Sequence, residues 1–126
     1  MSVKCIHNAG FFSCCSVKLN HITYFINLHK AFPRIVDSSA QFDWYKTKKH
    51  KNNDITYEYF THYTNVQNIQ FTCPINYHHS YQFINYSSID YKGIIPIIKK
   101  YFSPSNDIEN IINMFVYQMR NYSYLQ

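Results

Sequence analysis

The fold is decided by residues 3–38, which read VKCIHNAGFFSCCSVKLNHITYFINLHKAFPRIVDS. Val3–His7 mixes apolar and β-compatible residues and stops at the turn residues NAG, so it predicts a first strand. Arg34–Ser38 is a short apolar run after Pro33, and it predicts a second, buried strand. Two strands separated by a helix form a βαβ unit. The pattern therefore predicts parallel pairing with a right-handed crossover.

The segment between these strands has the periodicity of an amphipathic helix. Ser13 or Ser16 is the expected N-cap, and Pro33 ends the helix before about residue 32. Apolar residues at helical spacing predict its buried face: Cys15, Leu19, Ile22, Phe25 and Ile26. Polar residues fall on the other faces and are expected away from the core: Lys18, Asn20 and Asn27.

The segments that follow carry weaker signals. Gln41–Lys46 (QFDWYK) predicts a helical turn that packs Phe42 and Trp44 on the sheet. Lys46–Asn53 predicts a loop. Asp54–Phe60 (DITYEYF) is compatible with a strand or a short helix, and the capping residue at its start favours the helix.

Two further segments complete the middle of the chain. Residues 66–86 alternate apolar and polar residues around Pro74, which predicts one or two short strands. Tyr91–Phe102 is apolar with a central Pro96, so we expect a helical turn or two with Pro96 near a helix start.

Ser103–Tyr122 is the most regular element of the chain and predicts an amphipathic helix. The N-cap is either Ser103, with proline at the first helical position, or Ser105 or Asn106 one turn later. Acidic residues in the first turn suit the helix dipole: Asp107 and Glu109. Its apolar stripe needs a cover and consists of Ile108, Ile111, Ile112, Phe115 and Met119.

Composition limits the class of protein. A chain of 126 residues with 46% hydrophobic residues fits one globular domain, residues 1–126. Lysine, asparagine, isoleucine and tyrosine dominate, as they do when the coding DNA is AT-rich. No secretion signal and no apolar run of about 18–20 residues is present, so we expect an intracellular protein without a membrane segment. If the protein is viral, it would lie in the host cytoplasm or the virion.

The chain is basic, with a formal net charge of +5. The densest cluster, Lys46–Lys51 (KTKKHK), lacks arginine and lies between predicted elements, which favours a solvated basic loop. Two other interpretations remain open. The cluster could steer phosphate groups or a nucleotide sugar, or it could contact nucleic acid, which is the less favoured of the two.

Few residues have the spacing of a catalytic or metal site. Cys14 and Cys15 are adjacent, but the chain has no CxxC or HxxxH pair, so they predict packing positions and no metal site. His78 and His79 would point to opposite faces of a strand and could not easily chelate one ion. The loop after the first strand lacks GxGxxG, and no other complete catalytic motif occurs. The sequence therefore names no catalytic residue and no cofactor.

The ends of the two predicted strands are better candidates for binding. His7 ends the first strand, and Asp37 is expected to end the second with the serines after it. Ligands of α/β proteins bind outside the carboxyl ends of parallel strands. We therefore treat both residues as candidate binding residues, with a structural role as the alternative for His7.

Three separated stretches together resemble the N-terminal part of fucosyltransferase-like glycosyltransferases, particularly those of large DNA viruses. These stretches are AGFFSCCSVKLNHI (Ala9–Ile22), FPRIVDSSAQFDWYK (Phe32–Lys46) and YFSPSNDIENIINMF (Tyr101–Phe115). In that family a strand, a GFFS-like loop, a helix and a P-x-V-D strand open the chain, and a YF-x-P-S-x-x-I helix start comes later. Their order and approximate spacing match over most of the 126 residues.

The resemblance implies a Rossmann-like half of a two-domain enzyme of GT-B type, which uses a nucleotide sugar such as GDP-fucose without an essential metal. The family loop that faces the interdomain cleft maps onto Ala9, Gly10, Phe11, Phe12 and Ser13. The donor-binding H-x-R-x-x-D motif is not found in the 126 residues. We therefore expect no catalysis by the chain alone, and expect as partners a nucleotide sugar or glycan, and a second chain or a second copy at the C-terminal helix. The alternative is a non-enzymatic interaction or structural protein of a virus with an AT-rich genome.

Overall fold

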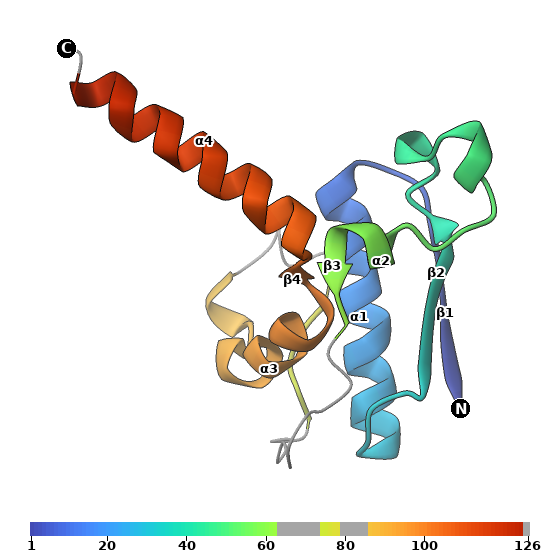
Figure 1. Ribbon diagram of the computed structural model, residues 1–126. Helices are drawn as coiled ribbons and strands as arrows, with labels where there is room; N and C mark the ends of the chain where they lie inside the picture. The colour runs from blue at the N-terminus through green and yellow to red at the C-terminus, as the bar shows by residue number, and fades with distance from the viewer. Residues whose placement is uncertain (63–73, 79–85, 125–126) are drawn as a thin grey trace.

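A computed structural model describes residues 1–62, 74–78 and 86–124 of the chain (Figure 1). The fold is mixed α/β. Its elements in chain order are β1 (Ser2–His7), α1 (Phe11–His29), β2 (Ile35–Gln41), the 3-10 turns η1 (Asp43–Tyr45) and η2 (Lys48–His50), α2 (Thr56–Tyr59), β3 (Phe60–Thr61), the 3-10 turn η4 (Tyr86–Ser88), α3 (Tyr91–Tyr101), β4 (Ser103–Pro104) and α4 (Asn106–Tyr124). The strands predicted within residues 66–86 fall mostly outside the described residues, as does His79.

The predicted strand–helix–strand unit is present. β1 and β2 form a parallel pair, with Val3 opposite Val36 and His7 opposite Gln41. β1 alternates as a half-buried strand should, because Cys5 is fully buried whereas Lys4 and Ile6 are exposed. Within the described residues α1 covers the inward face of this pair, and the outward face is open (Figure 1).

The prediction that Ser13 or Ser16 is the N-cap of α1 is wrong. The helix begins at Phe11 with Gly10 as N-cap, and its N-terminus has no side-chain cap. Ser13 is already inside the first turn, where its Oγ lies 2.9 Å from Nε2 of His7. The chain therefore enters the helix directly from the turn after β1, and the serine hydroxyl bonds the end of the strand instead.

The buried face of α1 is confirmed with two changes. Leu19, Ile22, Phe25 and Ile26 are buried as expected, but Cys14 is fully buried in place of Cys15, which is half-buried. Lys18, expected away from the core, is also completely buried. A tertiary contact explains this burial: the Nζ of Lys18 donates a hydrogen bond at 3.2 Å to Oγ1 of Thr56, a residue distant in sequence.

The main core lies between α1, the sheet and α3. Its buried members are Cys5, Leu19, Ile22, Ile26, Val36, Ile75, Ile94, Ile97 and Tyr101. α3 begins earlier than expected, because the Asp90 carboxylate accepts a hydrogen bond from the Gly93 amide and caps the helix. Pro96 consequently lies inside α3 and not near its start.

The segment after β2 follows its prediction only in part. η1 is the expected helical turn, and Phe42 is buried in a second, smaller core with Cys14 and Ile55. Trp44, however, is 69% exposed and does not pack on the sheet. Phe42 has a left-handed backbone with φ of 63°, which sends its ring inward and turns the tryptophan outward.

The predicted short helix is α2, and the Asp54 carboxylate accepts the Thr56 amide at its start. Phe60 and Thr61 leave it as β3, which pairs antiparallel with β4. Ser103 and Pro104 are therefore strand residues. The later cap is correct, because Oγ of Ser105 accepts a hydrogen bond from the Ile108 amide.

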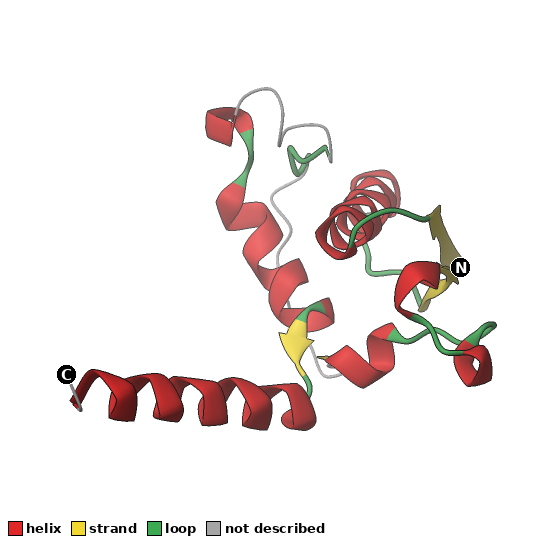
Figure 2. Cartoon of the chain, turned by 90° about the horizontal axis from the view of Figure 1, so that it is seen from above, coloured by secondary structure: helices red, strands yellow, loops and turns green. Residues whose placement is uncertain are grey.

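α4 projects away from the rest of the chain in both views (Figures 1 and 2). Every side chain from residue 109 to 121 is exposed, including the stripe residues Ile111, Ile112, Phe115 and Met119, whereas Ile108 at the start of the stripe is half-buried. The helix is confirmed, and the described chain leaves its stripe uncovered beyond Ile108.

Candidate functional site

A hollow of about 690 Å³ opens at the carboxyl ends of β1 and β2. We call it the basic hollow, and its lining residues are Ile6, Asn8, Ser39, Ala40, Asp43, Lys46, Thr47, Lys48, Lys51 and Asn52. Three lysines face one aspartate there, so the hollow carries a positive charge. Its position, at the end of a parallel strand pair, is where α/β folds bind ligands.

A β-bulge shapes the edge of the basic hollow. The register of the sheet shifts between Lys4 and Ile6, because β2 uses one residue more than β1. Two carboxylates bind the amides of the bulge: Asp54 accepts from Ser38 at 2.9 Å, and Asp37 accepts from Ser39 at 2.8 Å. Bulges often lie beside binding sites because they redirect side chains. Here the bulge brings the Ser39–Ala40 segment to the wall of the hollow.

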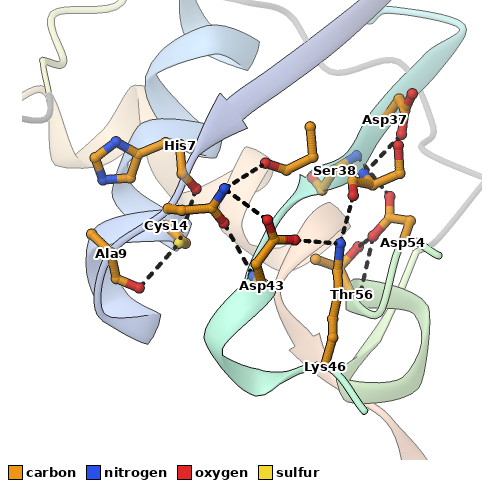
Figure 3. A network of polar contacts seen from close by, with 12 residues as sticks. His7, Ala9, Cys14, Asp37, Ser38, Asp43, Lys46, Asp54 and Thr56 are labelled. Carbon is orange, nitrogen blue, oxygen red and sulfur yellow. Dashed lines mark hydrogen bonds and ion pairs between the residues drawn. The ribbon is translucent and has the colours of Figure 1, made fainter. Parts of the chain in front are cut away.

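Asn8 joins the end of β1 to the floor of the hollow. Its Nδ2 donates to a carboxylate oxygen of Asp43 at 3.0 Å and to the Ala40 carbonyl, and its Oδ1 accepts from the Asp43 amide. Asp43 also pairs with Nζ of Lys46 at 3.0 Å, and that ammonium donates to the Ser39 carbonyl (Figure 3). These contacts hold η1 and both strand ends in one arrangement.

The expected solvated basic loop needs one correction. The Lys46 side chain is only 3% exposed, because its ammonium is enclosed by Ser39 and Asp43. Lys48 and Lys51 are exposed and line the hollow, whereas Lys49, between them in sequence, is exposed but does not line it. The charge that a ligand would meet comes mainly from Lys48 and Lys51.

The loop that the resemblance singled out lies beside the hollow but does not line it. The Phe11 amide donates to the hydroxyl of Tyr45 at 2.8 Å, which joins the start of α1 to η1. The Phe11 ring packs against Phe42 and Tyr59, and Phe12 is 84% exposed. These two rings line a separate apolar groove of about 360 Å³ with Cys15, Ser16, Leu19, Phe60, Tyr77, Ile98 and Phe102.

The structure separates the other predicted binding residues. His7 is half-buried at the end of β1, within hydrogen-bond distance of Ser13. Asp37 does not end its strand, because β2 runs on to Gln41. It lies opposite Lys4, about 10 Å along the sheet from His7. The hydrogen bonds from Ser39 lower the pKa of Asp37, which suits a carboxylate that fixes the bulge.

The adjacent cysteines occupy packing positions. Cys14 Sγ donates to the His7 carbonyl at 3.3 Å and to the Ala9 carbonyl at 3.6 Å, so it closes the turn between β1 and α1 (Figure 3). Burial raises the pKa of Cys15 to about 12 and that of Cys5 to about 11. Both thiols therefore stay protonated at neutral pH and are poor nucleophiles.

A buried polar network lies behind the bulge. Lys18, Thr56 and Asp54 form a chain of hydrogen bonds that ends on the Ser38 amide. Burial lowers the pKa of Lys18, and the Asp54 carboxylate opposes that shift. Nearby, His62 packs edge-on against Tyr57, and burial lowers its pKa to about 4. This network is enclosed, so we assign it to holding the loop and not to contact with a ligand.

We found no protein family, curated protein or solved structure that matches the chain. In the part that the structure describes, no helix is long and apolar enough to cross a membrane. No group of three or more histidine, cysteine, aspartate or glutamate side chains among those same residues could hold a metal ion. The candidate site therefore rests on geometry and charge alone.

Sequence reasoning missed Asn8 and Asp43, because their roles depend on contacts between segments more than 30 residues apart. Only one signal was available. Steering of phosphate groups is one of the interpretations that the Lys46–Lys51 cluster allows, and two of its exposed lysines, Lys48 and Lys51, line the basic hollow.

Proposed function

We propose that the chain is the N-terminal, Rossmann-like half of a fucosyltransferase-like glycosyltransferase of GT-B type, and that it binds a nucleotide sugar in the basic hollow. One observation carries this proposal. A positively charged hollow lies at the carboxyl ends of the parallel strands β1 and β2. Lysine ammonium groups attract phosphate oxygens as point charges, and a hollow of about 690 Å³ is large enough for a nucleotide sugar.

The same arrangement supports the proposed division of work. Lys48 and Lys51 would meet the phosphate groups, while Asn52 offers an amide group to a sugar hydroxyl. The exposed Phe12 ring and the apolar groove beside α1 would lie next to a glycan acceptor. The donor-binding motif of the resembled family is not in these residues, so transfer would need a second body that carries it.

Titration calorimetry with GDP-fucose, GDP and inorganic pyrophosphate tests this proposal. We expect GDP-fucose to bind, and the double variant Lys48→Ala/Lys51→Ala to bind at least about tenfold more weakly, because two charged contacts are lost. Lys49→Ala removes one exposed lysine of the same loop that does not line the hollow, and it should bind with unchanged affinity. Raising the salt concentration should weaken binding.

Three outcomes would count against the proposal. Absence of binding at millimolar ligand concentrations would show that the basic hollow is not a binding site for these ligands. Equal affinity for pyrophosphate and GDP-fucose would reduce the hollow to a phosphate site. Turnover of GDP-fucose by the purified 126-residue chain would contradict the expectation that a second body is required.

A non-enzymatic interaction protein is the second candidate. It is favoured by the apolar stripe of α4, which is exposed from Ile111 to Met119. A viral source is supported only by the resemblance and the AT-rich residue usage.

A further inference from the structure

In the described part of the chain, α4 carries a largely exposed apolar seam with the spacing of a coiled coil. Ile108, Ile112, Phe115 and Met119 follow one another at intervals of four, three and four residues, which is the a/d pattern of a heptad. Ile112, Phe115 and Met119 are 46%, 62% and 60% exposed. We call these four residues the α4 seam.

Two further apolar residues widen the α4 seam without breaking it. Ile111 and Val116 flank it on either side, at the g and e positions of the same heptad. The six side chains together occupy an arc of roughly 140° around the helix. A contiguous apolar strip of this kind on a projecting helix marks an interaction surface.

We propose that the α4 seam binds the α4 seam of a second copy in an antiparallel two-helix pair. In this arrangement Ile108 lies opposite Met119 of the second copy, and Ile112 lies opposite Phe115 of the second copy. A regular heptad selects another helix as its partner, because knobs of one seam fill the holes of an equally spaced seam. A second copy of the chain carries an identically spaced seam.

Charge selects the antiparallel direction. Glu109 and Arg120 lie on the same edge of the α4 seam, three helical turns apart. Reversing one helix brings Glu109 of each copy within about one turn of Arg120 of the other, and it also opposes the two helix dipoles. A parallel pair would instead place this edge of the two helices on opposite sides of the contact, where Glu109 and Arg120 of different copies do not meet.

The charge of α4 also argues against a membrane surface as the occupant. Helices that lie in a membrane interface carry a polar face rich in lysine and arginine. The described turns of α4 carry Asp107 and Glu109 against Arg120, so the polar face is slightly acidic. It would be repelled by anionic lipids.

The contact area predicts a weak dimer. The six apolar residues span Ile108–Met119, which is about 18 Å of helix, and burying a strip of roughly 140° over that length on each of two helices removes about 600 Å² from solvent. That area lies below the usual range of stable interfaces and is typical of a weak contact. We therefore expect a dissociation constant in the micromolar range and not an obligate dimer.

Sedimentation velocity of the full chain from about 5 to about 500 µM tests the pair, since this range spans a micromolar dissociation constant. Phe115→Lys places a charge in the centre of the seam and should weaken association at least about 30-fold. Asn110→Lys adds the same charge on the face of the same exposed helix that points away from the seam, and it should leave association unchanged. Far-UV circular dichroism of both variants confirms that the chain is folded.

The direction is tested by charge reversal. Glu109→Lys and Arg120→Glu should each weaken the dimer about three- to tenfold, and the double variant should restore it, because both pairs are then reversed together. A monomer at every concentration, or equal loss with Asn110→Lys and Phe115→Lys, would overturn the dimer. A double variant weaker than either single variant would overturn the antiparallel direction. The inference does not rest on the ligand proposed above, and nucleotide binding tests that ligand separately.

Discussion

At the scale of single residues, the most informative position is Lys18. A helical wheel places it away from the apolar stripe, yet its side chain crosses the core and donates to Thr56. Burial of an ammonium group costs several kcal/mol unless it finds partners. The Asp54 carboxylate, which raises the pKa of Lys18 against the effect of burial, supplies that compensation. The lysine therefore ties α1 to α2 behind the bulge at the basic hollow.

His62 makes the folded chain sensitive to acid. Burial lowers its pKa to about 4, from about 6.5 in an unfolded chain. Between these values the unfolded state binds more protons, so stability present above pH 6.5 is lost as the pH falls towards 4. When the pH falls across this interval, the free energy of unfolding of His62→Phe should decrease by about 1–2 kcal/mol less than that of the wild type, allowing for partial solvent screening. Urea unfolding at pH 7 and pH 4.5 measures the difference.

A suitable control is His29→Phe, which removes an exposed histidine of α1. Phenylalanine at position 62 keeps a ring that can pack against Tyr57, as the His62 ring does with a centroid distance of 4.0 Å. The comparison therefore reports the effect of protonating His62 and not the loss of ring packing. Parallel pH curves for the wild type and His62→Phe would contradict the assignment.

At the scale of elements, α3 depends on its only glycine. A Cβ on Gly93 would lie 2.5 Å from Oδ2 of the capping Asp90 and 3.2 Å from Ile75. Alanine is intrinsically better in a helix by about 1 kcal/mol. Here the clash displaces the cap and the core contact together, so we expect Gly93→Ala to destabilise the chain by about 0.5–1.5 kcal/mol. The urea midpoint at pH 7 reports this change.

The chain provides a matched control in Gly10, the N-cap of α1. A Cβ there meets no heavy atom within 4 Å, and its φ of −58° suits any residue. Gly10→Ala should therefore change stability by less than about 0.5 kcal/mol. If the two alanine variants were equally stable, the Asp90 cap would not be the constraint on α3.

The elements that could be predicted are those with a local signal. β1, α1, β2 and α4 were predicted because alternation and helical periodicity act within a few residues. Periodicity does not show which side chain caps a helix. Ser13 bonds His7, a few residues before it, instead of capping α1, and Asp90 caps the Gly93 amide and so starts α3 ahead of Pro96. The exposure of Trp44 follows from the left-handed backbone of Phe42, for which the sequence has no glycine or asparagine signal.

The candidate site was less predictable than the fold. A binding role at the carboxyl ends of the strands could be expected from the βαβ pattern alone. The residues that form the site could not be predicted, because the basic hollow is assembled from Asn8, the bulge of β2 and the loop that carries Lys48 and Lys51. The bulge itself depends on the Asp54 carboxylate, sixteen residues beyond the Ser38 amide that it binds.

At the scale of the whole molecule, two parts of different character are joined at β4. One is the body, in which α1, the sheet and α3 share a core. The other is α4, whose exposed turns add little to that core. The body carries the proposed ligand site, and α4 carries the proposed contact with a second copy. Ligand binding and self-association should therefore vary independently.

This independence predicts the effect of removing α4. A chain of residues 1–105 keeps the β3–β4 pair and the hydrogen bond from the Ser105 amide to the Tyr59 carbonyl, so the body loses few buried contacts. We expect its free energy of unfolding to stay within about 1 kcal/mol of the full chain at low micromolar concentration. Far-UV circular dichroism in urea is the suitable measurement, since the exposed Trp44 is a poor reporter. The full chain alone should gain stability as its concentration rises, because association stabilises the folded state. A shortened chain that is unfolded in the absence of urea would show instead that α4 is part of the folding unit.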